Sequence, residues 1–482
     1  MSVTNTDHSL QIERLRAARS DPNSRILIRG ATILSMDPHV GDFARGDVLI
    51  QGKKIIAVAS SLEDAARNGN TITIDASGSI AVPGFQDTHR HCWQNQLRRL
   101  IPDCNDNGAY LDVTHHWLGH HYRPEDIYIG NLISALGALE SGVTTILDLF
   151  HNPRTPEHSD AAIAAFQDVG IRGVHASCGP LSGDWDNNWP SDLDRIRSQY
   201  FNTDDQLLSL RFATIGGDFA AEHVRLDAAK IRLARQMGLP LISDGVLGEA
   251  CSRRINEFAA EGLLGPDLTF IHCLDLDETA WKLIADNGVN VSIPTTSDAI
   301  IGISDTVPSI QKALDVGIKP GLSVDVEVTL TPDMFTQMRT LHAIQRMMIF
   351  SRRYAGETDL PEALRVRDVL ELATVSGAKT NGNFDKSGTL TPGKEADLVL
   401  IGAEDFNTMP LNNAYGTVVS GADTSNVHTV FVAGSVKKFG GKLVGWNIAD
   451  IRTKVHASRD HILTAGGFDL DIFEQQVGLL GN

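Results

Sequence analysis

The chain has 482 residues and a formal net charge of −18, with 42 lysine and arginine residues against 60 aspartate and glutamate residues. Apolar residues make up 42% of the sequence, which is enough for a large buried core and excludes a disordered chain. The acidic balance argues against nucleic acid or an anionic membrane as the main partner, because both bind a positive surface.

The spacing of the cysteines and the N-terminal sequence indicate the cellular compartment. The five cysteines are widely spaced and include no C-x-x-C pair, which is typical neither of a disulfide framework nor of a cysteine zinc site. The N-terminal 21 residues contain no apolar signal-peptide core, and no run of about 18 apolar residues predicts a membrane span. The sequence therefore favours a reduced, cytoplasmic protein.

Both ends of the chain have a β texture. Short β-branched runs separated by glycine and aspartate turns fill residues 25–60, and the same texture returns at 390–402 and 427–445. This arrangement predicts a small β-sandwich domain built from both chain termini around an intervening domain.

The middle of the chain alternates short apolar runs with segments of helical period. Runs suited to buried strands lie at 79–89, 143–150, 171–178, 210–216, 239–245, 268–273, 289–294 and 319–325. Helical segments between them include 124–142, 158–170 and 227–238. Eight such strands predict an α/β fold, the (β/α)8 TIM barrel, and a doubly wound sheet would instead need a G-x-G-x-x-G turn that is absent after the first strand. The expected boundaries are 1–78 for the N-terminal arm and first part of the β-sandwich, 79–384 for the barrel, 385–450 for the second part, and 451–482 for a C-terminal tail.

Polar residues close several of these strands at the end where barrel enzymes place their chemistry. His89 and His91 end the first strand and point to the same side, because side chains alternate along a strand. His272 ends the sixth strand and Asp325 the eighth. A buried structural histidine or a helix N-cap could explain His272 or Asp325 singly, but their common position favours a divalent metal centre with Asp325 as ligand and proton acceptor.

Several stretches, AVPGFQDTHRHCWQ, LESGVTTILDL, TFIHCLDLDE, NGVNVSIPTTSD, GLSVDVEVTLTPDMFTQMR and GTLTPGKEADLVLI, follow one another over residues 26–440. In these motifs the sequence resembles the amidohydrolase superfamily, close to its cytosine deaminase, chlorohydrolase and herbicide-hydrolase branch. The resemblance implies the same barrel and β-sandwich. It also implies one divalent metal, held by His89, His91, a strand-5 histidine and Asp325, with His272 contacting the attacking water or the substrate.

Strand 5 departs from the family pattern. Where the family has Leu-His-x-x-Glu, this chain reads Ile242-Ser243-Asp244-Gly245-Val246-Leu247. That register puts Asp244 at the ligand position and Leu247 where deaminases carry a proton-shuttling glutamate, and a shift of one residue would put Ser243 at the ligand position instead. An aspartate ligand would favour manganese or iron and could draw the metal toward His272, whereas the alternative is a weak or lost metal.

Other polar and aromatic residues are predicted near the barrel mouth. Trp93 and Gln94 follow the H-x-H pair, His151 closes the second strand, and Trp185 lies in the loop after the third. We expect these four residues to contact substrate. The histidine-rich run at 112–121 is expected to form a lid over the pocket.

Together these patterns predict a metal-dependent hydrolase in which Asp325 and His272 are catalytic and a metal-activated water attacks an sp² carbon. The metal ligands are expected to be His89, His91, Asp244, His272 and Asp325, with zinc as the first choice and iron, manganese or cobalt as alternatives. The substrate is expected to be a neutral, nitrogen-containing small molecule: an amide, urea, carbamate or heteroaromatic ring with a C–N, C–S or C–Cl bond. We expect no nucleic-acid or membrane partner and a homodimer or homotetramer. A non-hydrolytic lyase, decarboxylase or isomerase, or a catalytically decayed binding protein, are the alternatives.

Overall fold

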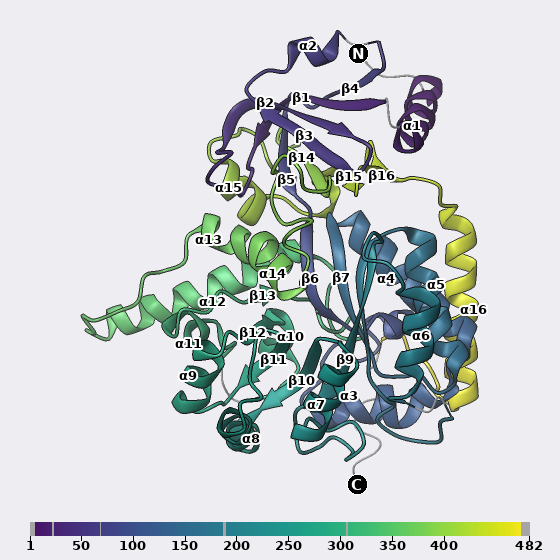
Figure 1. Ribbon diagram of the computed structural model, residues 1–482, viewed down its shortest axis with the longest axis vertical. Coiled ribbons are helices and arrows are strands. Elements are labelled where there is room, and N and C mark those ends of the chain that lie inside the picture. Colours follow the sequence, from purple (N-terminus) through teal and green to yellow (C-terminus); the bar gives the residue numbers. More distant parts are fainter. Residues whose placement is uncertain (1–4, 22–23, 68, 187–188, 305–306, 474–482) are drawn as a thin grey trace.

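Two β-sheets organise the computed structural model, which describes residues 5–473 except 22–23, 68, 187–188 and 305–306 (Figure 1). One sheet has eight parallel strands surrounded by helices, and the other forms a cap at the opposite end of the molecule from the barrel mouth. The fold expected from the sequence, a (β/α)8 barrel with a small domain made from both chain termini, is confirmed.

The barrel strands follow the apolar runs of the sequence. They are β6 (Phe85–Arg90), β7 (Val143–Phe150), β8 (Arg172–Ser177), β9 (Leu208–Ile215), β10 (Leu241–Leu247), β11 (Leu268–Leu274), β12 (Asn290–Ile293) and β13 (Gly321–Leu322). Neighbouring strands pair in sequence order from β6 to β13. The barrel closes beyond β13, where the backbone N–H of His91 donates to the carbonyl oxygen of Asp325 and that of Asp325 donates to the carbonyl oxygen of His89, at 3.0 and 2.9 Å.

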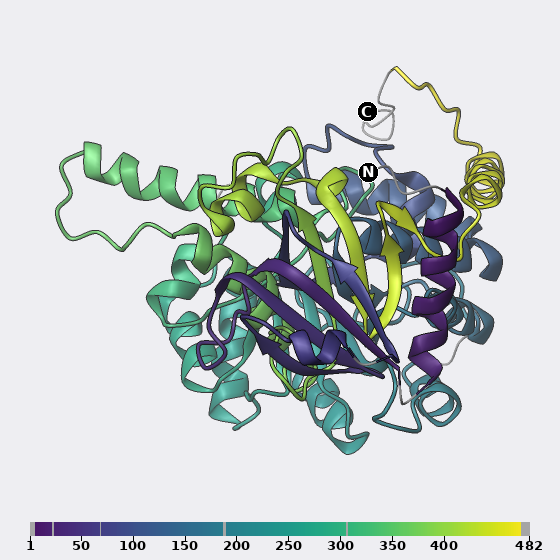
Figure 2. The ribbon, with the colours of Figure 1, turned by 90° about the horizontal axis from the view of Figure 1, so that it is seen from above.

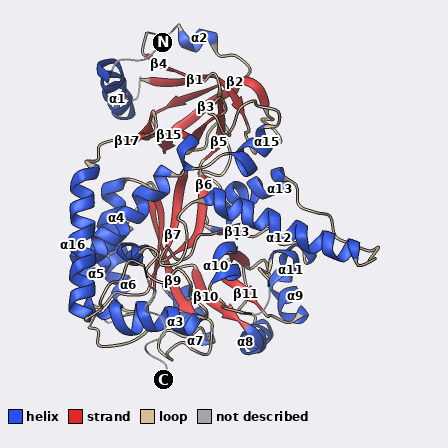
Figure 3. Cartoon of the chain, turned by 180° about the vertical axis from the view of Figure 1, so that it is seen from behind, coloured by secondary structure: helices blue, strands red, loops and turns tan. Residues whose placement is uncertain are grey.

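Helices cover the outside of the barrel (Figures 1 and 3). They are α4 (Pro124–Glu140), α5 (Pro156–Val169), α6 (Asp192–Tyr200), α7 (Ala228–Gln236), α8 (Gly248–Ala260), α9 (Glu278–Asp286), α11 (Ile310–Asp315), α12 (Met334–Tyr354), α13 (Val366–Glu371) and α14 (Gly377–Thr380). The short helix α10 (Thr295–Ile300) instead follows β12 at the mouth, and its first four residues are buried. Local signals set their ends: α5 begins with a proline after Thr155 and ends at Gly170, which takes a left-handed conformation. Short helices after β6, namely η1 (Cys92–Leu97), α3 (Asn107–Leu111), η2 (Asp112–Trp117) and η3 (Leu118–His121), build one wall of the mouth.

The small domain is one hydrogen-bonded sheet that curves over its own apolar core (Figure 2). Its strands are β1 (Arg25–Ile33), β2 (Phe43–Gln51), β3 (Lys54–Ala59), β4 (Thr71–Asp75), β5 (Ser79–Pro83), β14 (Leu398–Gly402), β15 (Val427–Val432), β16 (Ser435–Phe439) and β17 (Lys442–Leu443). Helix α1 (Asn5–Ser20) packs beside it, and α2 (Glu63–Ala66), α15 (Ala414–Gly416), η5 (Thr417–Gly421) and η6 (Thr424–Asn426) lie in its connections. The sheet is continuous, rather than split into the two layers of a sandwich.

The strand expected over 79–89 is in fact two strands. β5 pairs with β1 and β14 in the small domain, and only β6 enters the barrel. Gly84 separates them, and a Cβ at this position would lie 2.1 Å from the Thr144 side chain, so the chain can pass this point only as glycine. The barrel therefore begins at 85 rather than at 79.

Residues 451–473, expected to be a tail, largely form a structural strap. Helix α16 (Ile448–Gly466) runs along α4 from the small domain to the barrel mouth (Figures 1 and 3). There the indole N–H of Trp117 donates to the carbonyl of Gly466 at 2.7 Å, and Gln96 donates to Ser458 at 2.9 Å. Within the described residues, no helix is both long and apolar enough to cross a membrane.

Arg172 joins the barrel to the small domain. Its guanidinium donates to Asp397 at 2.8 Å and to Glu395 at 2.7 Å, and all three side chains are buried. We expect Arg172→Met to lower the free energy of unfolding by about 3–5 kcal/mol, because it removes the cation that the buried Asp397 carboxylate faces and leaves Glu395 only Lys53, 3.6 Å away. Chemical denaturation would measure this. The matched control is Arg253→Met, which removes an exposed pair with Glu249 and should cost less than about 1 kcal/mol. Equal losses in both variants would contradict the expectation.

Candidate metal centre and active site

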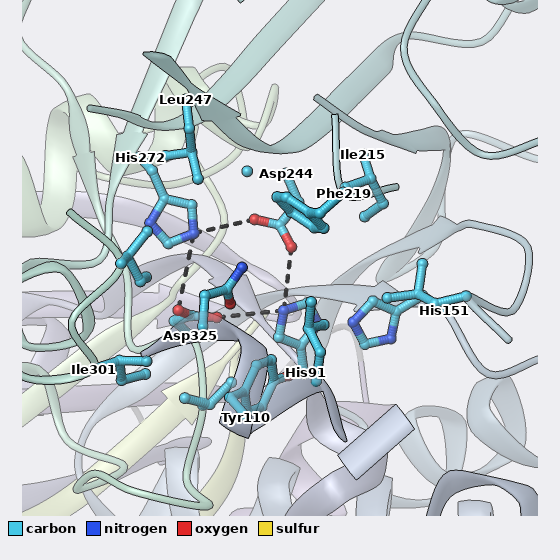
Figure 4. A pocket seen from close by; sticks show the side chains of 16 residues that line it. His91, Tyr110, His151, Ile215, Phe219, Asp244, Leu247, His272, Ile301 and Asp325 are labelled. Atoms are coloured by element: carbon cyan, nitrogen blue, oxygen red, sulfur yellow. Dashed lines mark ion pairs between the residues drawn. The ribbon is translucent and has the colours of Figure 1, made fainter. Parts of the chain in front are cut away.

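Five side chains from four strand ends converge at the barrel mouth, and Figure 4 shows four of them, His91, Asp244, His272 and Asp325. His89 Nε2 lies 3.0 Å from Asp325 Oδ1 and 3.5 Å from Asp244 Oδ1. His91 Nε2 lies 3.3 Å from Asp325 Oδ1 and 3.4 Å from Asp244 Oδ2. His272 Nε2 completes the group, 3.1 Å from Asp244 Oδ1. The structure thus brings together every residue predicted as a metal ligand.

The local backbone explains how these side chains reach one point. His89 and His91 point inward together because of the strand pleat of β6. His272 and Asp325 adopt left-handed backbone conformations, with φ of 69° and 70°, at the points where their strands end. Non-glycine residues with positive φ cost of order 1–3 kcal/mol and cluster at functional sites.

The cluster fits a divalent metal ion. Both ring nitrogens of His89 and Oδ1 of Asp244 are buried and have no hydrogen-bond partner among the described residues. The candidate ligand atoms lie within 4.8 Å of one another in two overlapping groups, one with His89, His272 and Asp325 and the other with His89, His91 and Asp244. Imidazole nitrogens and carboxylate oxygens are ligands that zinc and related ions accept, and donor atoms about 2.0–2.2 Å from one ion would stand at such separations from each other. A metal ion bound by these nitrogen and oxygen atoms would explain why they have no hydrogen-bond partner.

The charges of the site support the same interpretation. Burial alone would raise the pKa of Asp244, but the charge of His89 and the close approach of His272 and His91 outweigh it and hold that pKa well below its usual range. Burial opposes a charge on His91, yet its contacts with Asp244 and Asp325 raise the pKa of His91 to about 10, and binding of a divalent ion would release this proton and leave the Nε2 lone pair as a ligand. The two carboxylates are thus ionised and attract positive charge, which a divalent ion supplies.

Further residues orient the metal-centre side chains. His91 Nδ1 lies 3.0 Å from the carbonyl oxygen of Leu149, and His272 Nδ1 lies 2.6 Å from Asp298 Oδ1. The Ser297 hydroxyl donates to Asp325. Ser297 and Asp298 end the stretch NGVNVSIPTTSD and were not among the predicted site residues. Partners of this kind fix ligand orientation and raise ligand basicity.

A buried ionic network ties the first barrel strand to the last. The Arg90 guanidinium donates to Asp87 at 2.6 Å and to Glu327 at 2.9 Å, and all three side chains are fully buried. Asp87 also accepts the backbone N–H of Val324 at 3.0 Å. Because Arg90 lies between the two histidines and Glu327 lies just after Asp325, this network holds the ligand-bearing segments in register.

A cavity of about 470 Å³, counting the space at its mouth, lies over the cluster. Its lining is mainly apolar beyond the metal-binding side chains: Leu111, Leu181, Ile215, Phe219, Leu247, Ile301, Ile303 and Val326. Asn107, Tyr110 and His151 add polar groups. No lysine, arginine or third carboxylate is among the described lining residues. The cavity therefore suits a small, uncharged molecule.

The residues predicted to contact substrate have different positions. His151 lines the cavity, where burial and the neighbouring His91 and His115 hold its pKa well below its usual value. Trp93 and Gln94 are fully buried behind the wall, with Gln94 donating to the Tyr110 hydroxyl at 2.7 Å. Trp185 stacks on His223 with ring centroids 5.2 Å apart and is not among the cavity-lining residues. The predicted lid, 112–121, contributes His115, which packs against His151 from behind.

The fifth strand of the barrel, β10, departs from the family pattern as the sequence indicated. Asp244 reaches the metal cluster, whereas Ser243 is buried and is not among the residues that line the cavity. Leu247 lines the cavity three residues later. The position expected for a proton-shuttling carboxylate is therefore occupied by an aliphatic side chain.

Comparison with known proteins agrees with this geometry. The sequence pattern of the amidohydrolase family matches residues 244–437. A 5'-deoxyadenosine deaminase of Methanosarcina barkeri is 26% identical over 443 residues, covering 85% of this chain and 92% of the relative. A 5-methylthioadenosine/S-adenosylhomocysteine deaminase of Caldicellulosiruptor saccharolyticus is 25% identical over 434 residues, covering 87% and 94%. Residues 244–437 thus carry the amidohydrolase pattern, and the chain is similar to these deaminases along most of its length.

Solved amidohydrolase-like structures share its fold. A zinc-bound adenosine deaminase from Xanthomonas campestris superposes with a TM-score of 0.76 at 19% identity, covering 92% of this chain and 99% of the other. An atrazine chlorohydrolase from Arthrobacter aurescens, also with zinc, gives 0.78 at 20% identity, covering 90% and 100%. Its sequence relatives are deaminases, which hydrolyse carbon–nitrogen bonds, and this similarity supports an enzyme of amidohydrolase type.

Proposed function

We propose that the protein is a metal-dependent hydrolase that adds water to an sp² carbon of a neutral nitrogen heteroaromatic molecule and expels ammonia, an amine or chloride. The observation that carries this proposal is the convergence of three imidazoles and two carboxylates beneath an uncharged cavity. The deaminases and the chlorohydrolase to which the chain is similar support this choice of bonds.

His89, His91, Asp244 and Asp325 would hold the metal, with His272 beside them. A divalent ion at this site supplies a Lewis acid that makes water a better nucleophile at neutral pH. Zinc is the proposed ion, with iron, manganese or cobalt as alternatives, of which manganese and iron are favoured by the extra carboxylate.

The chain's own residues supply the proton transfers. Burial would raise the pKa of Asp325, but the charge and close approach of His89 and the contact with His91 lower it, so its carboxylate is ionised and can accept a proton from the attacking water. Burial would lower the pKa of His272, but Asp298 and Asp244 raise it well above the usual value. The contact of Nδ1 with Asp298 favours a protonated imidazole, and we propose that the Nε2–H of His272 stabilises negative charge that develops on the substrate. Leu247 offers no proton, so we propose that Asp325 returns its proton to the leaving group.

Reaction in ¹⁸O-labelled water tests the proposal. The metal-loaded enzyme, offered a panel of amino-, alkylamino- and chloro-substituted pyrimidines, triazines and purines, should release a hydroxylated ring that carries one labelled oxygen. A product without label would instead support a lyase or isomerase, and a protein that retains no stoichiometric metal would support a decayed binding protein.

We also propose a cytoplasmic homodimer or homotetramer. The five cysteines are buried and unpaired, which supports a reducing compartment. Helix α12 projects from the barrel and exposes Met347 and Tyr354, 63% and 92% accessible, which supports a contact between subunits (Figure 2).

A further inference from the structure

His151 stands at the end of β7, directly against the metal centre. Its ring stacks on that of His91, with centroids 4.1 Å apart and planes 11° apart, and it lines the cavity (Figure 4). His115 meets the same ring at a right angle, 4.3 Å away. Since the side chain is 2% exposed and packed on two sides, a few fixed neighbours decide which hydrogen bonds it can make.

One hydrogen bond fixes the position of the proton on His151. The indole Nε1 of Trp93 lies 3.0 Å from Nδ1 of His151. An indole N–H can only donate, so Nδ1 must accept with its lone pair, and the proton of the neutral imidazole is on Nε2. Among the described residues no hydrogen bond uses Nε2, which leaves this N–H available to a molecule in the cavity.

His91 has the opposite arrangement. Its Nδ1 lies 3.0 Å from the carbonyl oxygen of Leu149, which can only accept, so Nδ1 carries the proton. The lone pair of Nε2 then faces Asp244 and Asp325, as a metal ligand requires. The two stacked imidazoles therefore differ in chemistry: His91 presents a lone pair and His151 presents a hydrogen.

Trp93 is held rigidly in its place behind the cavity wall. Its side chain is fully buried and meets the Tyr122 ring edge-on at 4.8 Å. Helix α4 passes so close that a Cβ at Gly130 would lie 2.4 Å from the Trp93 carbonyl oxygen. Because Trp93 does not line the cavity, it acts on any ligand only through His151.

We propose that His151 donates its Nε2–H to an acceptor atom of the substrate, a ring nitrogen or carbonyl oxygen next to the reacting carbon, and that Trp93 is the positioning residue that fixes this direction. This inference rests on the proposed hydrolase function and narrows its substrate class. The substrate has an acceptor on the side facing β7 and apolar substituents toward Ile215, Phe219 and Leu247. A ligand that presents an N–H at the His151 position leaves two donors facing each other and is rejected.

Nitrogen-15 NMR of histidine-labelled protein tests the direction of the hydrogen bond without any turnover. In the wild type, the His151 signals, identified by their loss in His151→Phe, should show a protonated Nε2 and an unprotonated Nδ1. In Trp93→Phe they should shift toward a mixture of tautomers, whereas Trp185→Phe, which alters a tryptophan outside the cavity lining, should leave them unchanged. A protonated Nδ1 in the wild type overturns the proposal.

Binding of pyrimidine and benzene, two rings of similar size, tests recognition in the metal-loaded protein. The preference for pyrimidine over benzene should be about tenfold larger in the wild type than in His151→Phe. A contact between a pyrimidine nitrogen and the metal would be the same in both proteins, so the difference reports the hydrogen bond from His151. Trp93→Phe should lose part of the preference, and the double variant should lose no more than His151→Phe alone. Equal preferences in wild type and His151→Phe overturn the proposal. If no labelled product forms but His151 has a protonated Nε2 and the protein prefers pyrimidine, only the proposed hydrolase function is wrong. If labelled product forms but Nδ1 of His151 is protonated, only this inference is wrong.

Discussion

Asp325→Asn is expected to lower kcat by about a thousandfold or more. The substitution preserves the size of the side chain but removes the negative charge that faces His89 at 3.0 Å and His91 at 3.3 Å. The amide cannot accept the proton of the attacking water, and it is a weaker metal ligand than a carboxylate. Steady-state kinetics with the best ring substrate, with metal content measured in parallel, would show the loss.

The matched control for this substitution is Asp218→Asn. Asp218 is a largely exposed carboxylate beside the cavity-lining Phe219, and it pairs with Arg254. Its neutralisation should change kcat less than twofold, because exposed pairs contribute little and the group faces no reacting atom. Asp325→Asn activity within tenfold of the wild type would show that another group accepts the proton.

Asp244→Asn is expected to reduce bound metal from about one ion per chain to a small fraction, with at least a tenfold to hundredfold loss of metal affinity. The carboxylate lies 3.1–3.5 Å from the Nε2 atoms of three histidines, so its neutralisation removes charge from the centre of the cluster. Metal analysis after dialysis and competition with a chelator would measure the loss. Asp244→His should restore binding, because imidazole is also a ligand for such ions.

Ser243→Ala provides the control on the same strand. Ser243 is buried next to Asp244 and is not among the residues that line the cavity, so its replacement should leave metal affinity unchanged. If Ser243→Ala lost the metal while Asp244→Asn kept it, the strand would be shifted by one residue in solution and the proposed ligand set would be wrong.

Much of the barrel could be predicted because local patterns and tertiary structure agree there. Seven of the eight apolar runs became single strands, one with the expected ends (143–150) and six with shifted ends. The carboxyl ends of the barrel strands place His89, His272 and Asp325 together, as parallel strands in a barrel must. The run at 79–89 was predicted as one strand because its apolar character continues through Gly84. The chain divides into two strands at Gly84, where it passes close to the Thr144 side chain. No local pattern carries that contact.

The remaining parts of the site depend on contacts between distant segments. Asp298 orients His272 across 26 residues, and Trp93 fixes the His151 tautomer across 58. The sequence indicated that Trp93 and His151 were near the mouth, but not that one lies behind the other. Residue type and spacing identify candidates, whereas hydrogen-bond direction requires three-dimensional neighbours.

The seam of the barrel has a consequence for folding. The hydrogen bonds that join the first strand to the last are made by the backbones of His89, His91 and Asp325. The metal centre and the last step of barrel closure are therefore the same event, reached only after both ends of the barrel sequence have been synthesised and have met. A partly synthesised chain lacks some of the metal ligands and therefore has no complete metal site. In the folded protein, an ion bound between the first and last strands would stabilise the closed barrel and slow its opening.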